Sequence, residues 1–92
     1  MNCLKFIVSG KVQGVYYRKF VSQAMNKSKF IGYVKNLNDG DVEVVVKNQE
    51  GLNIKDIFDI LYAGSPKSEV KFVDMVMYDY SINFNNSFEV RY

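Results

Sequence analysis

The chain has 92 residues, of which 48% are hydrophobic and 24% are charged, and its formal net charge is +2. A chain of this length and composition is expected to form one globular domain over residues 1–92, and so weak a net charge gives no support for nucleic-acid or membrane binding. The sequence contains no histidine and one cysteine, which excludes a histidine general base, a histidine-ligated metal and an internal disulfide. No apolar run approaches the length of a membrane span, so we expect a soluble, cytoplasmic protein.

The first predicted elements are a strand and a helix joined by a glycine-containing loop. Apolar and polar residues alternate from Leu4 to Ser9, which predicts a strand with one buried face. Apolar side chains then recur at the spacing of one helical face: Tyr17, Phe20, Val21, Ala24, Met25 and Ser28. Arg18 falls off this stripe at the mouth of the helix, and we expect its side chain to face the loop or solvent.

The middle of the chain predicts a hairpin followed by a second helix. One strand is expected over residues 30–36 and the next around Val44, joined by a turn rich in residues that tolerate positive φ. Asn53 is expected to cap the second helix, which should end at Gly64. The apolar stripe of this helix consists of Ile54, Ile57, Phe58, Leu61 and Tyr62.

Two more strands are predicted, over residues 70–77 and 88–92, and the polar stretch 79–87 between them is typical of a turn or loop. The order βαββαβ plus a short C-terminal strand predicts an α+β fold, the ferredoxin-like α/β sandwich. In it, two helices cover one face of an antiparallel sheet of order 4-1-3-2. The loop after the first strand and the end of the second strand then lie at nearby rims of the sheet.

The segment from Gly10 to Arg18 combines three features of a phosphate site. Glycines at a strand-to-helix turn allow backbone conformations that other residues avoid, and a helix N-terminus offers free amides and a positive dipole end. Arg18 adds a planar fork of donors that suits phosphate. Only two of the 12 basic residues are arginines, Arg18 and Arg91, so an arginine at this position suggests a demand for bidentate geometry.

At these residues the chain resembles the acylphosphatase family. The segment from Gly10 to Arg18 matches the family's first signature, and the segment from Gly32 to Asn36, followed by Gly40 and Val42, matches nearly all of its second. The loop at residues 64–68 and the closing strand at 88–92 also match, so the resemblance covers essentially the whole chain. Asn48 departs from it, because the family usually has glycine there. We expect the turn either to survive at this asparagine or to shift within residues 48–51.

The resemblance implies hydrolysis of the carboxyl-phosphate bond of acyl phosphates, without metal or other cofactor. It implies that Arg18 and the loop amides bind the phosphoryl group and that Asn36 holds the attacking water. The implied phosphate-binding loop consists of Gln13, Gly14, Val15, Tyr16, Tyr17 and Arg18. A carboxylate is a good leaving group that needs no general acid, so a chain without histidine can support this reaction. Inorganic phosphate or sulfate should bind as product or mimic.

Other residues carry narrower expectations. Tyr16 is expected to line the acyl side of the site, because it falls off the helical stripe. Gln13 is expected to present its backbone amide, and the stretch from Ser65 to Ser68 chiefly to stop the helix. Cys3 is expected to be a packed residue at the start of the first strand.

Two other functions stay open from the sequence. A non-catalytic phosphate- or anion-binding regulatory domain would keep the loop without turnover, although it would not call for Asn36. A ferredoxin-like RNA-binding module would place paired aromatic residues within a basic-Gly-aromatic motif, and the sequence has no such segment. We therefore expect a monomeric enzyme that acts on a small acyl phosphate, with neither nucleic acid nor membrane as a partner.

Overall fold

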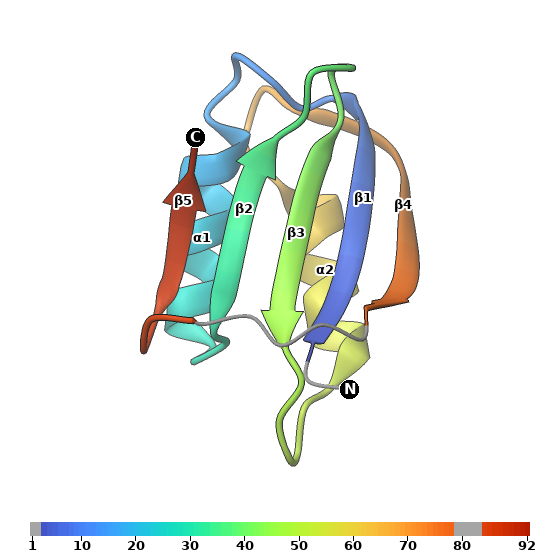
Figure 1. Cartoon of the computed structure of the whole chain (residues 1–92). Coiled ribbons are helices and arrows are strands. Elements are labelled where there is room, and N and C mark those ends of the chain that lie inside the picture. Colours follow the sequence, from blue (N-terminus) through green and yellow to red (C-terminus); the bar gives the residue numbers. More distant parts are fainter. Residues whose placement is uncertain (1–2, 79–83) are drawn as a thin grey trace.

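The computed structural model describes residues 3–78 and 84–92. The part of the predicted 79–87 loop at residues 79–83 lies outside the described residues. The described chain forms two helices and a sheet. Figure 1 shows the helices on one face of the sheet, which confirms the predicted α+β sandwich. The elements in chain order are β1 (Cys3–Lys11), α1 (Tyr17–Lys27), β2 (Gly32–Asn36), β3 (Val42–Lys47), α2 (Ile54–Ala63), β4 (Glu69–Tyr78) and β5 (Phe88–Arg91).

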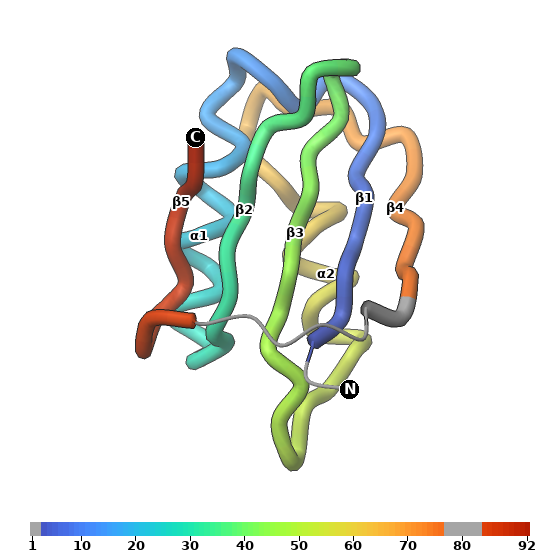
Figure 2. The backbone as a smooth tube through the Cα atoms, viewed as in Figure 1, coloured from blue at the N-terminus to red at the C-terminus, as the bar shows by residue number. Residues whose placement is uncertain are grey.

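The sheet has the strand order β4-β1-β3-β2-β5, which contains the predicted order 4-1-3-2. β1 is antiparallel to both β3 and β4, and β2 is antiparallel to β3. The last strand joins the β2 edge and runs parallel to β2, with Phe88 opposite Gly32 and Arg91 opposite Lys35. The complete sheet is therefore mixed, and its parallel pair brings the end of β5 beside the end of β2 (Figure 2).

The main core lies between the sheet and the helices. Alternate residues of β1 and β3 point toward the helices, and the facing positions of both helices are fully buried: Phe6, Val8, Val42, Val44, Val46, Tyr17, Val21, Met25, Ile57 and Leu61. Each predicted helical stripe includes residues that are not buried in the core. Phe20, Ile54 and Tyr62 lie at the edge of the core and are more than one-third exposed. Ser28 lies beyond the last residue of α1. None of the described helices is long and apolar enough to cross a membrane.

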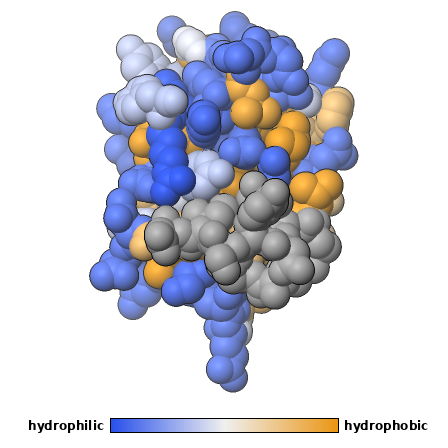
Figure 3. Space-filling model, viewed as in Figure 1, coloured by the Kyte–Doolittle hydropathy of each residue, from blue (hydrophilic) through white to orange (hydrophobic). Residues whose placement is uncertain are grey.

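The opposite face of the sheet carries a smaller buried cluster. Cys3, Tyr33 and Val45 are buried there, with Phe84 packed against them. Cys3 is fully buried at the start of β1, as predicted. Figure 3 shows this face with hydrophilic residues over most of its visible surface and apolar residues between them.

The turn after β3 does not lie at Asn48, where the family usually has glycine. Of the two expected outcomes, a turn kept at this asparagine or one shifted within residues 48–51, the structure shows the shift. The positive φ falls on Gly51, at 81°, and not on Asn48. The Leu52 amide donates a hydrogen bond to the Gln49 carbonyl at 3.1 Å, which closes the turn within this segment. The departure at Asn48 is therefore accommodated at the end of the sheet opposite the β1–α1 loop (Figure 1).

Candidate active site

The loop between β1 and α1 combines buried anchors with left-handed backbone. Val12 and Val15 are buried in the core, whereas Tyr16 is 73% exposed. Gly14 has φ 73° and Tyr16 has φ 61°, so the chain turns twice through the left-handed region before the helix begins. A Cβ added at Gly14 would meet no atom within 4 Å, so its backbone conformation alone explains the glycine.

The N-terminus of α1 has no protein group that caps it. Tyr16 stands at the N-cap position without a side-chain hydrogen bond, and the first turn contains no acidic residue. Within the described chain, no oxygen accepts a hydrogen bond from the amides of residues 13 to 18. A row of such amides at the positive end of a helix dipole is suited to bind an anion.

Three hydrogen bonds made by two side chains fasten this loop to distant parts of the chain. Gln13 Nε2 donates to the carbonyls of Leu37 and Asp41, both at 2.8 Å, and thereby ties the loop to the β2–β3 turn. Ser65 Oγ donates to the Val15 carbonyl at 2.6 Å from a buried position after α2. Neither role could be predicted from the sequence, because the partners are 24 to 50 residues away and carry no local signal.

Arg18 lies in the first turn of α1 and is held by the end of the chain. Its Nη1 donates to the Arg91 carbonyl at 3.0 Å, and its Cζ lies 4.6 Å from the centroid of the Tyr92 ring. These contacts orient the guanidinium through one donor and one face. The remaining N–H donors of the fork stay available to a ligand.

Asn36 is the last residue of β2, and its Oδ1 atom is buried without a hydrogen-bond partner. Such an atom is uncommon in folded proteins, because a buried acceptor without a partner costs about 1–3 kcal/mol. Asn36 also lines the cavity described next, and a side-chain amide can both donate a hydrogen bond to a water molecule and accept one from it.

Arg18 and Asn36 face one cavity of about 650 Å³, at the end of the molecule where the β1–α1 loop, β2 and β5 meet. Gly14, Tyr16 and Tyr17 also line it, together with Lys19 and Tyr92. The structure thus brings together most of the residues predicted for the phosphate-binding loop. Gln13 and Val15 do not line it with their side chains, which point to the β2–β3 turn and the core, so these two can offer only their amides.

Tyr17 has a structural role within this group. Its hydroxyl donates to the Leu61 carbonyl of α2 at 2.7 Å, and its ring is buried. Burial raises the pKa of the Tyr17 hydroxyl above its usual range, since the charged phenolate would lose its hydration. This hydroxyl therefore stays protonated and joins the two helices behind the cavity.

Comparison with known proteins gives the same family that the signatures suggest. The acylphosphatase family model matches residues 4–90. The curated acylphosphatase of Dehalococcoides mccartyi strain CBDB1 is 43% identical over 75 residues, which cover 80% of this chain and 81% of that protein. The curated acylphosphatase of Borrelia garinii subsp. bavariensis is 38% identical over 90 residues, which cover 96% of each chain.

A solved structure extends this similarity to three dimensions. The crystal structure of acylphosphatase from Bacillus subtilis matches with a TM-score of 0.84 and 32% sequence identity over the full length of both chains. Sequence signatures, family model and fold therefore agree along the whole described chain. The chain belongs to the acylphosphatase family of hydrolases.

Proposed function

We propose that this protein hydrolyses the carboxyl-phosphate bond of acyl phosphates and releases a carboxylate and inorganic phosphate. One observation carries the proposal: Arg18 and Asn36 line the same cavity, beside a loop whose amides have no acceptor in the described chain. Membership in the acylphosphatase family supports the same reaction. The roles of the individual residues below are our proposal.

The phosphoryl group would be bound by the loop and by Arg18. The amides of residues 13 to 18 and the free donors of the guanidinium surround one anion at the positive end of α1. Charge on the phosphoryl oxygens changes as the reaction proceeds, so donors fixed in advance stabilise the transition state. The loop can be fixed in this way because Gln13 and Ser65 fasten it from two sides.

Asn36, which lines the cavity, would orient the attacking water through its side-chain amide. The water oxygen forms a bond to phosphorus, the bond between phosphorus and the acyl oxygen breaks, and its electron pair leaves with the carboxylate. One proton of the water passes to an oxygen of the phosphate product. Since the leaving group is a stabilised carboxylate, no side chain needs to protonate it.

Several features favour a small, self-contained enzyme. The residues that line the cavity run from Val12 to Tyr92, so we infer that residues 1–92 act as one domain, and we propose that this domain works as a monomer. Cys3 is the single cysteine of the sequence and is buried, and we propose that the activity is cytoplasmic.

Release of phosphate from benzoyl phosphate and acetyl phosphate by the purified protein tests the proposal. We expect a rate far above the uncatalysed background, inhibition by inorganic phosphate that competes with substrate, and no change on addition of a chelator. A folded protein that binds phosphate but shows only the background rate would contradict the proposal and favour a regulatory anion-binding domain.

A further inference from the structure

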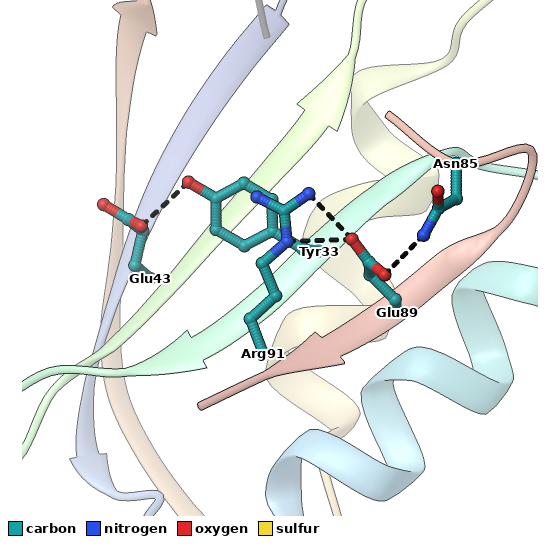
Figure 4. Close-up of polar contacts among 5 residues, drawn as sticks. All are labelled: Tyr33, Glu43, Asn85, Glu89 and Arg91. Atoms are coloured by element: carbon teal, nitrogen blue, oxygen red, sulfur yellow. Dashed lines mark hydrogen bonds and ion pairs between the residues drawn. The ribbon is translucent and has the colours of Figure 1, made fainter. Parts of the chain in front are cut away.

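The side chains of β5 alternate between the face of the sheet that borders the cavity and the opposite face. Phe88 and Val90 point toward the helices, where Phe88 is buried and Val90 lines the cavity. Glu89 and Arg91 alternate onto the other face, and Figure 4 shows their side chains beside Tyr33 of β2. One short strand therefore contacts both the site and a polar cluster on the far side of the sheet.

That cluster holds the Arg91 guanidinium in one place. Nε and Nη2 of Arg91 lie 2.8 and 2.7 Å from Glu89 Oε1, and Cζ lies 4.1 Å from the centroid of the Tyr33 ring. Glu89 also accepts a hydrogen bond from Asn85 at 2.7 Å, and the Tyr33 hydroxyl donates to Glu43 at 3.1 Å (Figure 4). Charge-assisted hydrogen bonds and a cation–π contact together restrict Arg91 more than either would alone.

The backbone of the same residue contacts Arg18. The Arg91 carbonyl accepts the hydrogen bond from Arg18 Nη1, and Tyr92, the next residue, supplies the ring beside the Arg18 guanidinium. Arg91 therefore has its side chain in the cluster on one face and its carbonyl against Arg18 at the cavity, directly before Tyr92.

We infer that Glu89 and Arg91 are positioning residues: through the Arg91 carbonyl and the Tyr92 ring, they orient Arg18 toward the phosphoryl group. The inference rests on the proposed function of Arg18. The other end of β5 is held separately, because buried Phe88 exchanges two hydrogen bonds with Asn26 of α1, at 2.9 and 2.7 Å. Loss of the cluster should therefore loosen the carboxyl end of β5 without detaching the strand.

Arg91→Met tests this inference, since it removes the guanidinium but leaves an unbranched stem over Tyr33. We expect kcat/KM for benzoyl phosphate to fall roughly tenfold, less than the hundredfold that a 1 Å displacement of a catalytic group can cause. Arg91→Lys should restore part of the loss, because a cation can still contact Tyr33 and Glu89. Lys55→Met is a matched control, since it removes an ion pair with Asp59 on the exposed face of α2 and should leave kcat/KM unchanged.

An NMR measurement reads the position of Arg18 without relying on turnover. The chain has only two arginines, so Arg91→Met leaves Arg18 as the single source of an arginine Nε–H signal. Compared with wild type, this signal should move toward that of free arginine, and the Kd for inorganic phosphate should rise severalfold. A folded Arg91→Met protein with an unchanged Arg18 signal would overturn the inference, whatever its activity.

A second variant covers the case in which Arg91→Met does not fold. Glu89→Gln keeps the shape of the side chain and removes its charge, so we expect the same changes in the Arg18 signal and in kcat/KM, but smaller. An Arg18 signal identical to wild type in Glu89→Gln would contradict the inference. If the wild-type protein does not hydrolyse acyl phosphates, the proposed function is contradicted. The Arg18 Nε–H signal and the Kd for inorganic phosphate would then still test whether Glu89 and Arg91 position Arg18.

Discussion

In the described chain, two loops lead from a strand into a helix, and they differ in how the N-terminus of the helix is capped and charged. Before α2, Asn53 Oδ1 accepts a hydrogen bond from the Lys55 amide at 3.0 Å, and Asp56 lies in the first turn. Before α1, Tyr16 provides no side-chain cap, no acidic residue follows in the first turn, and Arg18 adds positive charge. The N-terminus of α2 therefore has a hydrogen-bond acceptor and a negative charge from the chain itself, whereas the N-terminus of α1 has neither.

This difference identifies what makes a helix N-terminus a candidate ligand site. Both loops contain a left-handed glycine, Gly14 or Gly51, and both helices pack one face against the sheet, so neither feature distinguishes them. The two helices differ in the amides before α1, which lack an acceptor in the described chain, and in the cavity lined there by Arg18 and Asn36. An unsatisfied polar group costs stability, and a bound anion and water would offset that cost.

The largest expected effect comes from the second residue of each helix, Arg18 in α1 and Lys55 in α2. Arg18→Ala should lower kcat/KM for benzoyl phosphate by about 10²–10³, as for loss of one fixed charge-stabilising group, and should weaken inhibition by phosphate. Arg18→Lys should also be poor, because an ammonium lacks the planar fork. Lys55→Ala is the matched control, and a comparable loss of activity in this variant would contradict the distinction between the helices.

Substitution of Asn36 should separate turnover from phosphate binding. Asn36→Ala is expected to lower kcat by on the order of 100-fold, because the attacking water loses a fixed hydrogen-bond partner. The inhibition constant of inorganic phosphate should stay close to that of wild type. Asn38→Ala, in the exposed turn that follows β2, serves as the control. Equal losses of turnover and phosphate binding in Asn36→Ala would contradict the role in orienting water.

The two left-handed glycines give a smaller and more closely matched comparison. Gly14 has φ 73° and Gly51 has φ 81°, and an added Cβ would meet no atom within 4 Å at either position. Alanine at each should therefore lower the free energy of unfolding by a similar amount, about 1–2 kcal/mol, measured by urea denaturation. Only Gly14→Ala should also lower phosphate affinity. The prediction fails if both variants, or neither, change that affinity.

The smallest effect is expected at the cap of α2. Asn53→Ala should lower the free energy of unfolding by about 1 kcal/mol, because the Lys55 amide loses its acceptor. Activity measured well below the unfolding transition should not change. A loss of kcat/KM in the folded variant would show that the end of α2 influences the site after all.

Much of the fold and of the site could be predicted from local patterns. Alternation and helical stripes place the elements, and the residues around Arg18 are close enough in sequence to form a recognisable motif. The proximity of Asn36 to that motif followed from the strand order, and in the structure Arg18 and Asn36 line one cavity. Their catalytic roles remain a prediction.

The remainder depended on contacts between distant residues. The parallel pairing of β5 with β2, the hydrogen bonds made by the Gln13 and Ser65 side chains, and the contact between Arg18 and Arg91 join residues 24 to 73 positions apart. No periodicity encodes such contacts. Phe20 fits the stripe of α1 but lies at the rim of the core, because spacing shows which face is apolar and not how far the sheet extends beneath it.

A titration of the 15N-labelled protein with inorganic phosphate, followed through its backbone amide signals, tests the central claim most directly. We expect saturable shifts concentrated in the amides of residues 13 to 18, with residues 53 to 56 unaffected. Shifts of similar size at the start of α2, or no saturable change around Arg18, would show that the uncapped end of α1 is not the anion site.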